Sequence, residues 1–175
     1  MVNVFCTRKL EKLVDMEITN VEPSTLDESW NAHLVAIGGR KNILFVHKKT
    51  LYGILLVDVL KKDLLQIDRL FYDAFVAQLK NDRIYRVELE AVYRQRFDKV
   101  LLLPTDNDRK TIGTIRDLIL HLKSYCAVRP NKIEAARYFA QNTMNGIPIG
   151  SRKYAQSKNS MAEEMKTWNG LSEHA

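Results

Sequence analysis

The chain has 175 residues, of which 46% are hydrophobic and 27% charged, and its formal net charge is +6. This length suits one domain with a single hydrophobic core. The longest apolar runs, Ile54–Val57 and Val100–Leu103, are far too short to cross a bilayer. The N-terminus also lacks the basic and apolar regions of a secretory signal. We therefore expect a cytoplasmic protein that has no membrane segment.

The charge is spread unevenly along the chain. Residues 1–30 hold three basic and six acidic side chains, so the remaining residues hold 24 basic and 15 acidic side chains, a net charge of +9. A basic body attracts anionic partners over long range, such as nucleic acid or an acidic protein. Cys6 and Cys126 lie far apart without a CxxC pair, which predicts two reduced thiols in a reducing compartment.

The first half of the chain is dominated by strand patterns. Residues 2–6 alternate like a short strand, and Thr7 can cap a helix over 8–14. An acidic loop follows over 15–29. Gly38-Gly39 separates the strand-like runs 31–37 and 42–48 and supplies the backbone freedom that a hairpin needs. A third run over 50–59 is rich in β-branched and aromatic residues, which predicts a three-stranded β-meander.

Helical periodicity dominates after residue 60. An apolar stripe predicts a helix over 61–80, and 84–95 fits a helix better than a strand because Glu90 lies four residues before Arg94. A buried strand over 99–103 precedes a second long helix, 111–127, and a third over 132–143. The sequence thus predicts an α+β fold. Its small, mainly antiparallel sheet comprises the meander plus the N-terminal and one later strand, and several helices cover it, with 61–80 and 111–127 on one face.

We expect a single domain over 1–155, followed by a tail over 156–175. The tail contains a short amphipathic stretch with Met161, Met165 and Trp168. Such a stretch could dock on a partner protein as a helix.

Sequence motifs for the common catalytic and cofactor sites are missing. The chain has no GxGxxG, Walker loop, HExxH, GxSxG or paired CxxC. This absence favours a non-enzymatic protein without a metal or cofactor.

Two histidines form the most specific catalytic hypothesis. If the hairpin turn centres on Arg40, His33 faces His47, and their Cβ atoms lie about 5 Å apart on one face of the sheet. The pair could hold a divalent metal or act as a base, with Asp117 as a further candidate. Alternatively the two rings end the core face and bond to backbone or water, and a slip in register breaks the pairing.

Two further clusters suit anions. Arg109 and Lys110 lie at the start of the second long helix, where exposed backbone amides attract anions. The acidic and threonine residues around them are equally good helix caps. In the tail, Arg152 and Lys153 with Tyr154 suit a nucleic-acid backbone and a stacked base, although a solvated basic tail has the same composition.

Gly113 stands in the first turn of that second long helix. A glycine there costs about 1 kcal/mol relative to alanine. We expect close packing against the meander to explain it, and a ligand's backbone contact is the alternative.

Several spaced motifs resemble a family of short bacterial proteins known only as a domain of unknown function. The motifs are Cys6-Thr7-Arg8-Lys9-Leu10, Ser29-Trp30-Asn31-Ala32-His33-Leu34, Arg40-Lys41, Gly113-Thr114-Ile115-Arg116-Asp117 and Asn145-Gly146-Ile147-Pro148. The resemblance covers about residues 1–155, implies one compact prokaryotic domain, and assigns no activity. Relatives can carry Asn in place of His33 or His47, which counts against a catalytic or metal-binding pair. The aligned positions Trp30, Arg40, Lys41, Arg109, Gly113 and Asp117 are then the better candidates for a shared surface.

The leading functional hypothesis is a non-enzymatic binding module for an anionic partner, either nucleic acid or an acidic protein. Its candidate binding residues are Trp30, Arg40, Lys41, Arg109, Lys110, Arg152 and Lys153. One alternative is a hydrolase or nuclease that uses His33 and His47. The other is a protein-interaction module, such as an antitoxin or a defence inhibitor, that docks through the tail.

Overall fold

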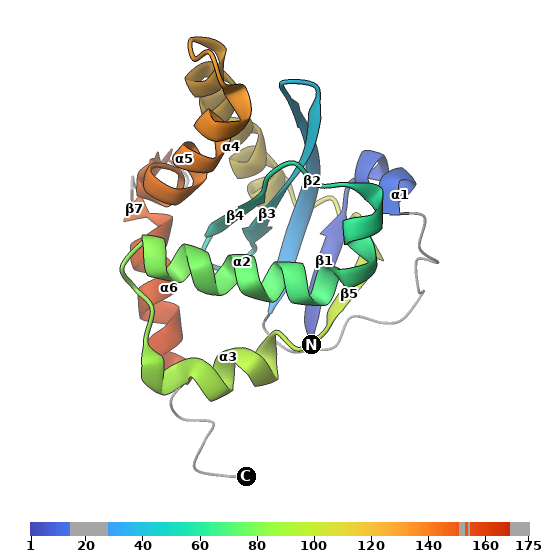
Figure 1. Cartoon of the computed structure of the whole chain (residues 1–175). Coiled ribbons are helices and arrows are strands. Elements are labelled where there is room, and N and C mark those ends of the chain that lie inside the picture. The colour runs from blue at the N-terminus through green and yellow to red at the C-terminus, as the bar shows by residue number, and fades with distance from the viewer. Residues whose placement is uncertain (15–27, 151–152, 154, 169–175) are drawn as a thin grey trace.

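The computed structural model describes residues 1–14, 28–150, 153 and 155–168, and a five-stranded sheet lies at its centre (Figure 1). The strand order is β4-β3-β2-β1-β5. The strands are β1 Val2–Cys6, β2 Ser29–Ile37, β3 Arg40–His47, β4 Gly53–Leu56 and β5 Val100–Pro104. β2, β3 and β4 form the expected antiparallel meander, whereas β1 runs parallel to both β2 and β5. The predicted α+β class is confirmed, with a sheet that is mixed around β1.

Helices fill most of the remaining chain. The α-helices are α1 Arg8–Val14, α2 Ile67–Asn81, α3 Glu90–Arg96, α4 Arg109–Ala127, α5 Lys132–Asn142 and α6 Ser157–Lys166. The 3₁₀ helices are η1 Lys61–Gln66, η2 Val87–Leu89 and η3 Met144–Gly146, and β6 Pro148–Ile149 pairs with β7 Ala155–Gln156. The ambiguous segment around residue 90 is helical, as predicted.

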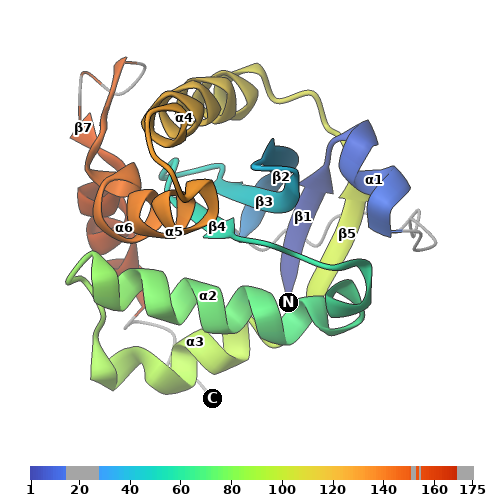
Figure 2. The same ribbon diagram turned by 45° about the horizontal axis from the view of Figure 1, so that its top comes forward.

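The two long helices lie on opposite faces of the sheet, so the expectation that both cover one face is wrong. Figure 2 shows α4 on the side of the sheet away from α2 and α3. The reason lies in the strands, whose successive side chains point to opposite faces. In β3, Ile43 and Phe45 join the core beneath α2, whereas Leu44 and Val46 join the core beneath α4. Both faces of the central strands are therefore apolar, and each face needs its own helical cover.

The core beneath α2 is rich in aromatic side chains. Phe71 packs edge-on against Trp30 at a centroid distance of 5.2 Å, and Phe75 stacks on Phe97 at 4.2 Å. Trp168 lies 6.1 Å from Phe97 in the same core. This face carries the larger share of the buried aromatic surface and supplies much of the apolar burial that stabilises the fold.

The helix α6 is part of this core. Met161, Met165 and Trp168 are at most 1% exposed, so their side chains cannot also form a free docking surface. This contradicts the predicted docking role of the apolar stretch. The division of the chain at residue 155 stays a prediction.

A buried polar network fastens the segment after α5 to the edge of the sheet. The Asn145 side chain accepts a hydrogen bond from Gly53 N at 2.7 Å and donates to Gly53 O at 2.9 Å. It also donates to Asp82 at 2.9 Å, and Asp82 accepts further bonds from Tyr52 and Gln78. We call these five residues the Asn145 network. A Cβ atom at Gly53 would lie 3.2 Å from the Met144 side chain, so glycine allows this close approach.

The two cysteines are free, in line with the two predicted thiols, and both are buried. Burial, followed by the nearby Glu11 carboxylate, raises the pKa of Cys6 to about 12, so its thiol is a packing group rather than a nucleophile. Among the described helices, none combines the length and the apolar run that a membrane span requires.

Candidate anion-binding site

The hairpin between β2 and β3 places His33 and His47 on opposite faces of the sheet. Its turn is Gly38-Gly39, with φ values of 57° and 76°, rather than a turn centred on Arg40. His33 therefore pairs with Leu44, and His47 pairs with Trp30. The register differs from the expected one by three residues, and an odd shift moves a side chain to the other face. The two imidazoles cannot share a metal or a substrate, and the predicted pair is wrong.

His47 lies in the core beneath α2. Its side chain is 1% exposed, its Nδ1 lies 2.8 Å from the Thr50 hydroxyl, and its ring lies 4.9 Å from that of Trp30. Its Nε2 lies 3.7 Å from the Glu28 carboxylate, which Arg96 also contacts at 2.6 Å. This arrangement joins β2, β3 and α3, and its His47 and Glu28 side chains are buried.

Trp30 is likewise fully buried. The prediction that Trp30 binds a partner at the surface is wrong, because its ring packs against Phe71 and Phe75 in the core. Asp117 is exposed on α4, on the face of the sheet opposite His47. Within the described part of the chain, no group of three His, Cys, Asp or Glu side chains could hold a metal ion.

The loop between β5 and α4 is held in place by its own aspartates. Asp106 accepts hydrogen bonds from Asn31, at 3.0 Å, and from Lys48. Burial opposes ionisation of Asp106, but the bonds from Lys48, Asn31 and the Asp108 backbone together lower its pKa. Asp108 caps α4 by accepting from the backbone amides of Lys110 and Thr111. These two amides, which could otherwise attract an anion, thus bind Asp108. The residues around Arg109 and Lys110 therefore act as helix caps, as the alternative interpretation predicted.

The charges of three exposed cations act on His33 in β2. The Thr7 amide, directly after β1, donates to Ala32 O at 3.1 Å, so His33 lies just past the carboxyl end of β1. Burial and then the charges of Lys9, Lys123 and Arg116 lower the pKa of the half-buried His33. We call these four residues the His33 cluster. In the described chain, its three cations make no ion pair within 4 Å.

The cluster lies where the chain topology favours a binding site. β1 leads into α1, whose Leu10 joins the core beneath α2, whereas the parallel neighbour β5 leads into α4 on the other face. Ligands of open parallel sheets bind at the carboxyl ends of strands whose connections diverge in this way. The Thr7 hydroxyl at this end is buried and has no hydrogen-bond partner among the described residues.

One exposed side of α4 extends the cluster into a row of cations. Arg109, Arg116 and Lys123 recur every seven residues, which places them along one stripe of the helix, about 21 Å long. Gly113 lies beside this stripe, and a Cβ atom there would meet nothing within 4 Å. The expectation that close packing explains Gly113 is therefore wrong. We call these three cations the α4 row.

The other predicted binding residues lie apart from this site. Arg40 and Lys41 are at the hairpin end of β3, where Arg40 Nε lies 3.8 Å from Asp58. Lys110 is exposed about 100° round the helix from Arg109. Lys153 is exposed in the turn between β6 and β7, and Arg152 lies outside the described residues. Only Arg109 of the predicted set belongs to the α4 row.

The sequence interpretation missed Lys9, Arg116 and Lys123 as site residues. The seven-residue spacing of the α4 row was visible in the sequence as a signal for Arg116 and Lys123. Lys9 carried no such signal, because its approach to His33 depends on the pairing of β1 with β2.

Comparison with known proteins gives a family and no activity. A family model described as Domain of unknown function (DUF6933) matches residues 3–160. No curated protein matches the chain, and no solved structure matches it either.

Proposed function

The chain belongs to the DUF6933 family of unknown function, and from that premise we propose that it is a non-enzymatic module that binds an anionic partner through the His33 cluster and the α4 row. The family assigns no chemistry, so the proposal depends on the side chains alone. The observation that carries it is that the charges of Lys9, Lys123 and Arg116 all act on a half-buried imidazole, while none of the three makes an ion pair within 4 Å in the part of the chain that the structure describes.

Like charges that gather in one place repel one another and cost folding free energy. Two other cations of the chain have carboxylate partners, since Lys48 contacts Asp106 and Arg96 contacts Glu28. A bound anion would offset the repulsion at the His33 cluster. The neutral His33 ring can also donate a hydrogen bond to such an anion.

The α4 row favours an extended anion over a compact one. Its three cations follow a helix for about 21 Å, which matches a strand with regularly spaced phosphates better than a single small ion. The phosphate backbone of a nucleic acid is therefore the partner that this geometry fits best. An acidic protein segment is the other anionic partner, and the experiment separates the two.

The alternatives from the sequence have less support. A hydrolase that uses His33 with His47 needs the two rings on one face, and they lie on opposite faces. An interaction module that docks through the apolar side of α6 needs Met161 and Met165 at the surface, and both are buried.

The test is a binding titration of a triple variant, Lys9→Gln, Arg116→Gln and Lys123→Gln. Its probes are a single-stranded 20-mer DNA, a duplex of the same length and poly-glutamate, each at several salt concentrations. We expect the wild type to bind nucleic acid with a steep salt dependence. Each phosphate contact contributes about 0.7–0.9 to the slope of log affinity against log salt, so the variant should lose about 2 from that slope.

The matched control replaces three exposed cations elsewhere, Lys62→Gln, Arg69→Gln and Lys99→Gln, and so has the same net charge. It should retain most of the wild-type affinity. If both variants lose the same affinity for nucleic acid, net charge alone explains the binding and the site is rejected. If the wild type binds only poly-glutamate and the first variant does not, the partner is an acidic protein. If no probe binds at low salt, the proposal is rejected.

A further inference from the structure

The outer side of β4 carries backbone groups that the sheet does not use. β4 is an edge strand of the described sheet. The His47 amide donates to Tyr52 O at 2.8 Å, so Tyr52 and every second residue after it bond towards β3. Gly53 and Leu55 therefore turn their N–H and C=O groups outward.

Asn145 shows how this outer side can be paired. Its side-chain amide accepts from Gly53 N and donates to Gly53 O, which is the pair of bonds that a residue on an added strand would make. At Leu55, the next outward residue, no hydrogen-bond partner for these two groups is described in the structure. The edge is thus occupied at its first position and open at its second.

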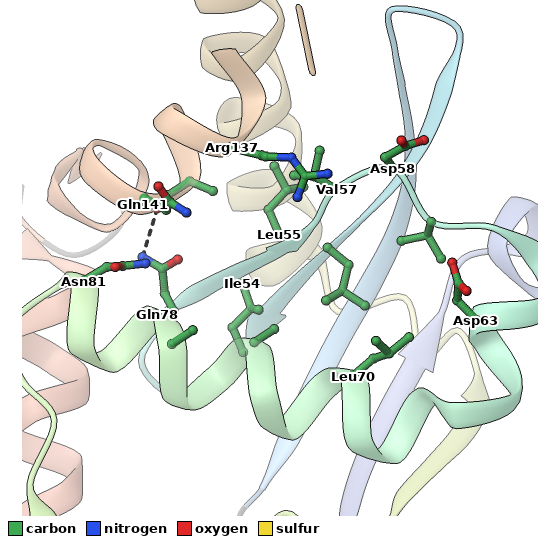
Figure 3. Close-up of a pocket in the computed structure, with 15 residues that line it drawn as sticks. Ile54, Leu55, Val57, Asp58, Asp63, Leu70, Gln78, Asn81, Arg137 and Gln141 are labelled. Carbon is green, nitrogen blue, oxygen red and sulfur yellow. Dashed lines mark hydrogen bonds between the residues drawn. The ribbon is translucent and has the colours of Figure 1, made fainter. Parts of the chain in front are cut away.

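A pocket of about 250 Å³ adjoins this open position, between α2 and α5 (Figure 3). Ile54, Leu56 and Leu70 contribute apolar side chains, and Gln78 and Gln141 contribute amides. At one end, the Gln78 amide donates to Ala140 O at 2.9 Å and joins the two helices. The pocket is therefore a short recess with the sheet edge as one wall.

Arg137 supplies the free charge of this pocket. It is exposed and makes no ion pair within 4 Å in the described chain. Of the two acidic lining residues, Asp58 lies 3.8 Å from Arg40. Asp63 keeps its charge and accepts from Leu60 N at 2.9 Å, but it lies apart from Arg137 (Figure 3). A guanidinium binds a carboxylate through two parallel hydrogen bonds, so the Arg137 side of the pocket favours a ligand that carries a carboxylate.

We propose that this pocket is a docking site for an extended peptide that carries a carboxylate, which adds a short strand to β4 and pairs with Arg137. Backbone bonds to Leu55 supply affinity, and the apolar lining and Arg137 supply selectivity. The carboxylate comes either from an acidic side chain or from a C-terminus, and both present the same group to Arg137. This site is separate from the His33 cluster and does not depend on it.

The test selects peptides on the full chain and then maps their backbone contacts. The probes are two displayed libraries of random nonapeptides, one with a free C-terminus and one followed by further residues. Enrichment from only the first library identifies a C-terminal carboxylate, and enrichment from both identifies an acidic side chain. We expect the enriched peptides to share a carboxylate, and methylation of alternate backbone nitrogens to weaken binding by about tenfold at every second position.

Three protein variants complete the test. Arg137→Gln should weaken the selected peptides by about tenfold, whereas Lys132→Gln, at the exposed start of the same helix, should leave their affinity unchanged. Ala77→Phe fills the pocket from an exposed position of α2 and should abolish binding without affecting the fold. The proposal is overturned if no peptide is enriched, if Arg137→Gln and Ala77→Phe bind as the wild type does, or if N-methylation shows no alternation.

Discussion

The Asn145 network and the His33 cluster are both polar, but only the first has partners for its polar groups among the described residues. In the Asn145 network, the Asp82 carboxylate accepts from Tyr52, Gln78 and Asn145. In the His33 cluster, the charges of three cations act on an imidazole, and no described carboxylate forms an ion pair with them. A network whose donors and acceptors match can stabilise the fold by itself. A cluster of like charges cannot, so we expect this difference to separate structural polar residues from those that bind a partner.

The difference also divides the motifs that stand out in the sequence into two kinds. Asn145, from the motif near the C-terminus, and Trp30, from the motif in β2, have their partners inside the protein. Arg109 and Arg116, from the segment that begins α4, have none in the described chain. We therefore expect changes in the first kind to affect the free energy of unfolding, and changes in the second kind to affect binding.

The strongest test of this division is Asn145→Ala. The substitution leaves the outward N–H and C=O groups of Gly53 without partners, and the half-buried Asp82 carboxylate loses one of its three hydrogen-bond donors. We expect the free energy of unfolding to fall by about 3 kcal/mol, measured by urea denaturation. The exposed Asn142 donates to Tyr138 O, and Asn142→Ala is the control, with an expected loss below about 0.5 kcal/mol. Similar losses in both variants would remove the structural role of the network.

Alanine at two glycines should change the free energy of unfolding by smaller amounts and in opposite directions. Gly53→Ala adds a Cβ atom 3.2 Å from Met144, in the network region, and should destabilise the protein by about 1–2 kcal/mol. Gly113→Ala adds one to open space beside the α4 row and should stabilise the helix by about 0.5–1 kcal/mol. A destabilised Gly113→Ala variant would show that the α4 surface is packed after all, and would weaken its assignment as a binding surface.

The sequence predicted local elements well, because periodicity and capping are local. It located the meander, the helices and the strand around residue 101. It could not predict the hairpin register, since the position of a two-glycine turn decides which face His33 occupies. Nor could it place α2 and α4 on opposite faces, because both helices carry one apolar stripe and both faces of β3 are apolar. The His33 cluster depends on contacts between distant segments, so periodicity pointed to its α4 members and not to their meeting with Lys9.

The smallest effect concerns the titration of His33. Burial, and then the charges of Lys9, Lys123 and Arg116, lower its pKa below the usual 6.5, so the folded protein favours the neutral ring. The unfolded chain takes up a proton near pH 6.5, so this contribution to stability is present above that pH and is lost as the pH falls towards the folded pKa.

Arg116→Gln should raise the pKa of His33, and a bound polyanion should raise it further, since a nearby negative charge favours the imidazolium. The measurement is an NMR titration of the ring protons, assigned with His33→Gln. A pKa at or above 6.5 in the free protein would mean that neither burial nor the three cations determine the titration of His33. A pKa that a bound polyanion leaves unchanged would place the ligand elsewhere on the surface.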